Sequence, residues 1–211
     1  MIVFPNCKIN LGLQVLRKRA DGYHDISTIF YPIPLTDSLE LVTDITLKDP
    51  ILFTSSGIEV GTSLEENLCV RAFRLLKSRY PELPSVRMHL HKVIPMGAGL
   101  GGGSSDAAFT LKLINQKYQL GISTGQLQDF ALELGSDCPF FIENKPCFAT
   151  GRGEEMQPAS IDLSRYKLVL VYPGIHISTS WAFGAIDPGI SHIAMDPVLS
   201  EPVNNWKNFL V

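Results

Sequence analysis

Several kinds of sequence feature are missing from this chain of 211 residues. No apolar run approaches the roughly 20 residues that a membrane-spanning helix needs. The first residues, 1–4, lack the basic stretch and the cleavage site of a signal peptide. The formal net charge is −3, whereas nucleic-acid-binding proteins usually carry a basic excess. We therefore expect a cytoplasmic protein that binds neither a membrane nor nucleic acid.

Cysteine is also scarce and is not arranged in pairs. The four cysteines contain no C-x-x-C spacing and lie far apart in the sequence, at Cys7, Cys69, Cys138 and Cys147. This spacing is typical of buried free thiols in a reducing compartment, and it argues against a disulfide framework or a zinc site.

Glycine, by contrast, is concentrated in one stretch, Pro95 to Ala108, which contains Gly97, Gly99, Gly101, Gly102 and Gly103. Two serines follow, and residues 107–116 have good helix-forming sequence. A glycine loop that enters a helix presents unpaired backbone N–H groups and the positive end of the helix dipole, which together suit phosphate. A flexible linker is the alternative, and the immediate serines and apolar helix disfavour it.

The loop does not match the two best-known phosphate motifs. A Walker A loop ends in Gly-Lys-Ser/Thr, and this triplet occurs nowhere in the chain. Gly97, Gly99 and Gly102 have G-x-G-x-x-G spacing, but a dinucleotide fold needs an acidic residue about 20 positions further on. The corresponding region, residues 118–125, has no carboxylate.

Hydrophobic periodicity predicts strands mixed with helices, so we expect an α+β fold. A Ser63–Glu66 capping box predicts a helix whose apolar face runs from Leu68 to Leu76. His89 and His91 fall on outward positions of a strand, which favours solvent exposure over metal binding. The further predicted helices cover residues 107–116 and 127–134, and the predicted strands cover residues 9–16, 26–33, 39–42, 51–54, 86–90, 139–142, 147–150 and 168–172.

Two charged residues lie in apolar surroundings, Lys8 before the first long strand and Asp137 between a helix end and an apolar segment. Burying either charge is costly unless it is paired. A plain salt bridge between them is one explanation. The other is catalytic, because phosphoryl transfer needs a cation and a group that orients the acceptor hydroxyl. The residues alone leave both open.

The glycine stretch, with the segments around Lys8 and Asp137, resembles the GHMP kinases, named for galactokinase, homoserine kinase, mevalonate kinase and phosphomevalonate kinase. The resemblance implies a two-domain α+β fold with its active site in the cleft between the domains. Residues 1–152 would form the N-terminal nucleotide domain, which is similar to ribosomal protein S5. Residues 153–211 would begin a C-terminal α/β domain. The implied cofactors are ATP and Mg²⁺.

The resemblance also implies roles for individual residues. Asp137 matches the aspartate that acts as base toward the acceptor hydroxyl, and Lys8 matches the lysine that orients that hydroxyl. Asn67 and Lys92 match positions near the adenosine of ATP, and Ser105 is the implied Mg²⁺ ligand. The loop residues that would hold the triphosphate are Pro95, Gly97, Gly99, Leu100, Gly101, Gly102, Gly103, Ser104 and Ser105. Position 106 is often Asn in such loops; Asp106 is expected to point outward as a helix-cap residue or to help hold Mg²⁺.

The segment Arg19–Asp25 contains Asp-Gly-Tyr-His and is similar to one branch of the family. That branch phosphorylates a cytidine-diphosphate-linked sugar alcohol in the non-mevalonate isoprenoid route. The likeness implies that His24 pairs with the cytosine, that Tyr23 and Phe183 stack on it, and that Asn10 contacts the substrate. Without it, Tyr23-His24 is an ordinary turn after Asp-Gly. A kinase for mevalonate or homoserine, and a non-catalytic nucleotide-binding module, remain the alternatives.

One departure from the family pattern concerns the end of the chain. Family members carry a third glycine-rich motif, and nothing after Gly153 supplies it. We therefore expect a fragment of a longer protein, in which the apolar segment 168–171 is exposed because the strands that would cover it are missing.

Overall fold

The computed structural model describes the chain except for residues 62, 176–178, 187–200, 202 and 209–211. The chain folds into two compact units, each assembled from segments that are distant in sequence. Unit 1 comprises Met1–Cys7, Ile33–Met96 and Leu100–Asn144, and unit 2 comprises Lys8–Pro32, Gly97–Gly99 and Lys145–Val211. The family domain boundary expected after residue 152 stays a prediction.

Unit 1 contains a four-stranded sheet in the order β1-β4-β6-β5. Strand β4 pairs antiparallel with both β1 and β6, whereas β5 runs parallel to β6. Along β6, Val86, Met88 and Leu90 are buried, while Arg87 and His91 are exposed and His89 is half-buried. This alternation is the period-2 pattern of a sheet with one covered face. The strands are β1 (Ile2–Val3), β4 (Ser38–Thr43), β5 (Ile51–Gly57) and β6 (Val86–Lys92).

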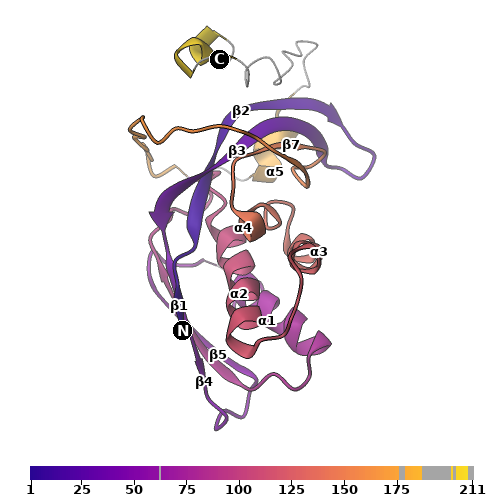
Figure 1. The fold of residues 1–211 in the computed structure, drawn as a ribbon, viewed down its shortest axis with the longest axis vertical. Helices are drawn as coiled ribbons and strands as arrows, with labels where there is room; N and C mark the ends of the chain where they lie inside the picture. Colours follow the sequence, from indigo (N-terminus) through magenta and orange to yellow (C-terminus); the bar gives the residue numbers. More distant parts are fainter. Residues whose placement is uncertain (62, 176–178, 187–200, 202, 209–211) are drawn as a thin grey trace. The chain divides into compact units, whose positions relative to one another are not determined.

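Helices α1 (Leu68–Arg79) and α2 (Gly102–Tyr118) lie on one face of this sheet and pack against each other (Figure 1). The core between helices and sheet is built from large apolar side chains that are at most 2% exposed, among them Leu39, Leu41, Phe73, Leu76, Met88, Leu90, Leu111 and Ile114. The mixture of sheets and packed helices confirms the predicted α+β class.

The start of α1 differs from the prediction. Glu66 accepts hydrogen bonds from the backbone N and the hydroxyl of Ser63, at 3.2 and 2.8 Å, but these bonds close a turn. The helix starts one turn later, where Asn67 is the N-cap and its Oδ1 accepts from the backbone N of Cys69 at 2.9 Å. A Ser-x-x-Glu segment identifies a reversal of the chain, and a better cap close by can take over the helix start.

After α2, helix α3 (Thr124–Leu134) begins with a complete capping box between Ser123 and Gln126 and ends at Gly135. The predicted strand over residues 139–142 is wrong, because α4 (Phe140–Glu143) is a single helical turn. Its three apolar residues are all buried, so the segment shows no strand alternation to distinguish the two structures.

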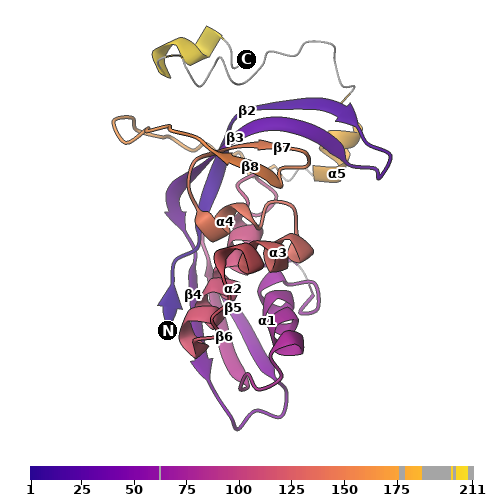
Figure 2. The same ribbon diagram turned by 45° about the vertical axis from the view of Figure 1, so that its right-hand side comes forward.

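Unit 2 contains a second four-stranded sheet, in the order β2-β3-β7-β8 (Figure 2). Strands β2 (Asn6–Lys18) and β3 (His24–Thr36) are long. The first residues of β2 and the last residues of β3 belong to unit 1. Strands β7 (Cys147–Thr150) and β8 (Glu155–Pro158) complete the sheet, and the unit also contains α5 (Thr179–Gly184) and a 3₁₀ helix, Val203–Asn208. A small core forms around Leu163 and Trp206.

The segment 168–172 was predicted as a strand but has no regular secondary structure. Its side chains are exposed, as the sequence predicted: Val169 is 84% and Val171 is 80% accessible. A strand needs a neighbouring strand for its backbone hydrogen bonds. Within the part of the chain that the structure describes, no strand pairs with this segment, so its β-forming sequence remains unpaired.

Candidate active site

The glycine loop has the backbone conformation that its sequence predicts. Gly97, Gly99 and Gly101 have φ angles of 66°, 72° and 68°, in the left-handed region that other residues rarely adopt. Gly101 is the N-cap of α2, and no side chain caps the backbone there. The first N–H groups of this 17-residue helix therefore remain available to an anion.

Two polar atoms at the start of α2 are buried without a partner among the described residues. They are the Ser105 hydroxyl and Oδ1 of Asp106. A buried unsatisfied polar atom is costly, and it commonly marks a place that a ligand, ion or water fills. This observation fits a phosphate group and its cation at the loop.

Of the two positions expected for Asp106, the outward helix-cap position is wrong, and the role as a Mg²⁺ ligand stays a prediction. Its side chain is 3% exposed and accepts a hydrogen bond from the Lys92 ammonium at 2.8 Å. Burial, with nearby Asp37, raises the pKa of Asp106 to about 7. Burial also opposes the charge on Lys92, but Asp106 and Asp37 outweigh it and raise the pKa of Lys92 above its ordinary value. The ammonium is thus held in its charged form between two acids.

Sequence reasoning missed Asp37, which lies in the single-residue break between β3 and β4. The side chain is fully buried and accepts a hydrogen bond from Lys92 at 2.5 Å. A carboxylate between two apolar strands was the available signal, since such a residue is rarely buried without a charged partner. The sequence does not show which cation that partner would be.

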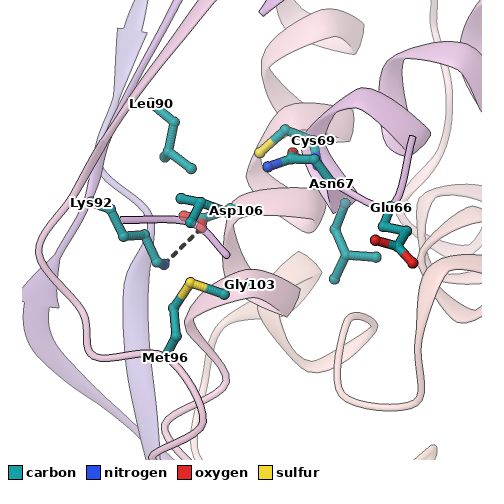
Figure 3. Close-up of a pocket in the computed structure, with 10 residues that line it drawn as sticks. Glu66, Asn67, Cys69, Leu90, Lys92, Met96, Gly103 and Asp106 are labelled. Carbon is teal, nitrogen blue, oxygen red and sulfur yellow. Dashed lines mark hydrogen bonds and ion pairs between the residues drawn. The ribbon is translucent and has the colours of Figure 1, made fainter. Parts of the chain in front are cut away.

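Next to this network, a cavity of about 110 Å³ opens in unit 1 (Figure 3). Asn67, Lys92 and Gly103 line it together with the apolar Val60, Leu68, Leu90 and Met96. The structure therefore brings both residues expected near adenosine to one cavity. Its lining, apolar with a few polar groups, is typical of a small-molecule pocket.

Asp137 lies in the turn between α3 and α4, where it is half-buried. The next residue, Cys138, shares a side-chain hydrogen bond with Ser104 in the first turn of α2. Asp137 is thereby held near the end of α2 at which the glycine loop enters. Burial raises the pKa of the Cys138 thiol to about 12, so it is not a nucleophile, and all four cysteines are buried and free, as predicted.

In unit 2, Lys8 is buried within β2, with 5% of its surface exposed. Its ammonium donates to Oδ1 of Asn10 at 2.6 Å and lies 4.7 Å from the centre of the Phe30 ring. Asn10 in turn donates to the Thr28 hydroxyl at 3.0 Å. These contacts fix the direction of the ammonium. Because Lys8 and Asp137 belong to different units, their pairing stays a prediction, as does a position of the site between domains.

The turn between β2 and β3 carries the aromatic residues that the sequence singled out. His24 is buried, and its ring stacks on that of Phe183 from α5, with centroids 5.4 Å apart and planes 25° apart. Tyr23 is 52% exposed, and the Arg152 guanidinium lies 4.6 Å from the centre of its ring. The structure thus brings His24 and Phe183 together, although 159 positions separate them in the sequence. Tyr23 is the residue that precedes His24.

No group of three or more His, Cys, Asp or Glu side chains that could hold a metal occurs among the described residues. Mg²⁺ commonly takes only one or two protein ligands and completes its shell with phosphate oxygens and water. The unpartnered Ser105 hydroxyl fits such a ligand. A Mg²⁺ site at this hydroxyl stays a prediction.

A glycine loop that enters a helix presents backbone N–H groups that can bind phosphate. Residues 67–145 match the family described as GHMP kinases N terminal domain. Over these residues the chain thus has the N-terminal domain of the GHMP kinases, a family that uses ATP for phosphoryl transfer.

Comparisons over the whole of this chain identify one branch of the GHMP kinases. Over 211 residues the chain is 48% identical to the 4-diphosphocytidyl-2-C-methyl-D-erythritol kinase of Parabacteroides distasonis, covering all of this chain and 76% of that protein. It is 50% identical to the enzyme of the same name from Azobacteroides pseudotrichonymphae, covering all of this chain and 78% of that protein. A crystal structure of 4-(cytidine 5'-diphospho)-2C-methyl-D-erythritol kinase superposes with a TM-score of 0.71 at 33% identity, over 89% of this chain and 65% of that one.

The chain belongs to the 4-diphosphocytidyl-2-C-methyl-D-erythritol kinase family. It spans about three quarters of the length of these curated relatives. The resemblance stated from the sequence is confirmed, and with it the branch that Asp-Gly-Tyr-His indicated.

Proposed function

We propose that the protein transfers the γ-phosphoryl group of ATP to the 2-hydroxyl of 4-diphosphocytidyl-2-C-methyl-D-erythritol, a step of the non-mevalonate isoprenoid route. The observation that carries this proposal is identity of about half over the whole chain to kinases named for that substrate. The glycine loop and the His24–Phe183 stack supply the two chemical functions that the reaction needs, a phosphate cradle and a base-binding group.

The loop binds the triphosphate through its backbone. Left-handed glycines at 97, 99 and 101 direct successive peptide groups toward one ligand, and the N-terminus of α2 adds its positive dipole. The cavity beside Asn67 and Lys92 receives part of the adenosine. Pro95, Leu100, Gly102, Gly103, Ser104 and Ser105 are the remaining proposed ATP-binding positions.

Asp137 and Lys8 act on the acceptor hydroxyl. The hydrogen bond between Ser104 and Cys138 holds the Asp137 turn close to the phosphate end of α2, where the carboxylate can accept the hydroxyl proton. Lys8, oriented by Asn10 and Phe30, contributes a positive charge that favours the developing alkoxide.

His24, Tyr23 and Phe183 recognise the cytosine. The stack with Phe183 fixes the plane of the His24 ring, so its nitrogens meet the base edge in one orientation. The exposed Tyr23 ring offers a face for stacking, and Arg152 holds that ring from its other face. Asn10, which is hydrogen-bonded to Lys8 and Thr28, contacts the sugar alcohol.

Mg²⁺, held by the Ser105 hydroxyl together with ATP, would neutralise charge on the transferred phosphoryl group. No helix in the described residues is long and apolar enough to cross a membrane. We also propose that the protein works in the cytoplasm on this small molecule, without a nucleic-acid partner.

Turnover with alternative acceptors tests the proposal. The protein is incubated with Mg-ATP and either the cytidine-diphosphate substrate, mevalonate or homoserine, and products are followed by ³¹P NMR. We expect a new phosphate monoester only with the cytidine compound. Phosphorylation of mevalonate or homoserine instead would identify a different alcohol kinase. ATP binding without turnover of any acceptor would identify a nucleotide-binding module.

A further inference from the structure

A buried network of three charged side chains lies beneath the glycine loop. Asp37, Lys92 and Asp106 come from the β3–β4 break, the end of β6 and the first turns of α2. Their side chains are 0%, 2% and 3% exposed. The Lys92 ammonium donates to both carboxylates, at 2.5 Å to Asp37 and 2.8 Å to Asp106. Figure 3 shows Lys92 directed at Asp106 beside the cavity.

The network holds both ends of the loop. Oδ1 of Asp37 accepts from the backbone N–H groups of Val93 and Ile94, at 2.5 and 2.9 Å, immediately before Pro95. Asp106 follows the loop at its other end. Lys92 therefore connects the strand that enters the loop to the helix that leaves it, through one ammonium group.

The loop backbone also lies directly on Lys92. A Cβ atom added to Gly102 would lie 2.9 Å from the Lys92 Nζ and 2.9 Å from Cγ2 of Ile94. A Cβ on Gly57 would lie 2.2 Å from the Lys92 carbonyl oxygen. Glycine at 102 lets the start of α2 approach the lysine ammonium, and glycine at 57, at the end of β5, lets that strand approach the lysine backbone.

This burial is more than core packing requires. The network holds two acidic groups and one ammonium, and removing charges from water is costly even when they are paired. Apolar side chains of similar volume would fill the same space without that cost. A charged bridge does what apolar packing cannot, because its hydrogen bonds fix the direction of the loop ends as well as their separation.

We propose that Asp37, Lys92 and Asp106 are positioning residues, which hold the glycine loop in its ATP-binding conformation. The inference rests on the proposed function, since it assigns the loop to the triphosphate. The Lys92 ammonium is directed at the two carboxylates. Lys92 therefore affects ATP binding by holding the loop, and not by pairing with a phosphate group.

Calorimetry with a non-hydrolysable ATP analogue and with CDP tests the proposal. In Asp37→Ala and Lys92→Met we expect the Kd for the ATP analogue to rise at least about tenfold, while the Kd for CDP stays within about threefold. Asp106→Ala removes one charge and leaves the Lys92–Asp37 pair balanced, so it should fold even if Lys92→Met does not. Asp106→Ala should raise the Kd for the ATP analogue in the same way. Asp106→Asn keeps an acceptor for Lys92 and should bind as the unmodified protein does.

Leu113→Ala is the control for general destabilisation. Leu113 is fully buried in α2 and lies beyond the first turns that the network holds. We expect this variant to melt earlier but to bind the ATP analogue normally. The inference is overturned if folded Asp37→Ala and Asp106→Ala bind the analogue as tightly as the unmodified protein. It is also overturned if Leu113→Ala loses as much affinity. Absence of turnover in the unmodified protein would contradict the proposed function alone.

Discussion

The two candidate binding regions are built in different ways. The glycine loop presents backbone groups, and buried charges of unit 1 lie at both of its ends. In unit 2 the aromatic region presents side chains around the turn between β2 and β3, and Tyr23 is half exposed. The first region is fixed by the buried charges beside it, whereas the second combines a buried histidine stacked on Phe183 with the half-exposed Tyr23 ring.

This difference bears on what each region can select. A backbone cradle binds phosphate groups whatever they are attached to, because the N–H groups read only charge and shape. Side-chain rings and a histidine edge distinguish one base from another. We therefore expect changes in the glycine loop and its supporting network to alter ATP binding, and changes in the aromatic region to alter substrate choice. The following predictions, in order of decreasing effect, test that separation.

The largest effect should come from Asp137→Asn, which removes the charge of the proposed base and keeps its shape. We expect kcat to fall about 10²-fold or more, with the Kd for the ATP analogue unchanged. Steady-state kinetics and calorimetry measure the two quantities. Asp129→Asn, on the exposed face of α3, is the control and should have normal kcat. A near-normal kcat in Asp137→Asn would show that this carboxylate is not catalytic.

Gly102→Ala should act on ATP alone. Its Cβ would lie 2.9 Å from the Lys92 Nζ and force the loop or the lysine to move. Overpacking typically costs about 1–3 kcal/mol, so the Kd for the ATP analogue should rise roughly 5- to 150-fold. Gly125→Ala in α3 has open space and should bind normally. Unchanged ATP affinity in Gly102→Ala would mean that the loop is not the cradle.

His24→Ala should act on the cytidine compound alone. Losing the hydrogen bond, and leaving its partner on the base unpaired, should weaken CDP binding by about 1–3 kcal/mol. The Kd for the ATP analogue should stay within twofold. His91→Ala, on the exposed face of β6, is the matched control and should leave both affinities unchanged. Equal losses of CDP and ATP affinity in His24→Ala would contradict the separation of the two regions.

The smallest effect concerns pH and the turn that carries His24. Hydrogen bonds from Arg19 and Arg17 hold the pKa of Asp25 below its ordinary value of 3.8. Because this pKa is lower in the folded state than in the unfolded state, the ion pairs stabilise the folded state above pH 3.8. This contribution is lost as the pH falls from 3.8 through the lowered pKa of the folded state. The melting temperature of Asp25→Asn should therefore be lower than that of the unmodified protein at pH 7. The difference should shrink below pH 4, and a difference independent of pH would exclude the ion pairs as its source.

The sequence predicted the loop better than its support. Glycines at 97, 99 and 101 predict left-handed backbone because few other residues adopt it, and all three have positive φ. Asp37 was missed because pairing between distant charges depends on tertiary structure. For the same reason a surface position was one of the two alternatives expected for Asp106, although it is buried against Lys92.

Other differences between the predicted and the observed secondary structure arise where the local sequence is compatible with two structures. Residues 139–142 are apolar throughout, so periodicity could not separate a strand from the helical turn that forms. Segment 168–172 has strand-forming sequence but no partner strand among the described residues. By contrast, the alternation in β6 and the apolar face of α1 predicted both elements, because each buries one face only. The roles of Tyr23, His24 and Phe183 came from the family resemblance, since their sequence alone predicts a turn.

Calorimetric titration of the unmodified protein with CDP and with mevalonate tests the central claim, that unit 2 recognises cytidine. We predict saturable binding of CDP, lost in His24→Ala, and no measurable binding of mevalonate. Binding of mevalonate with none of CDP would contradict the account.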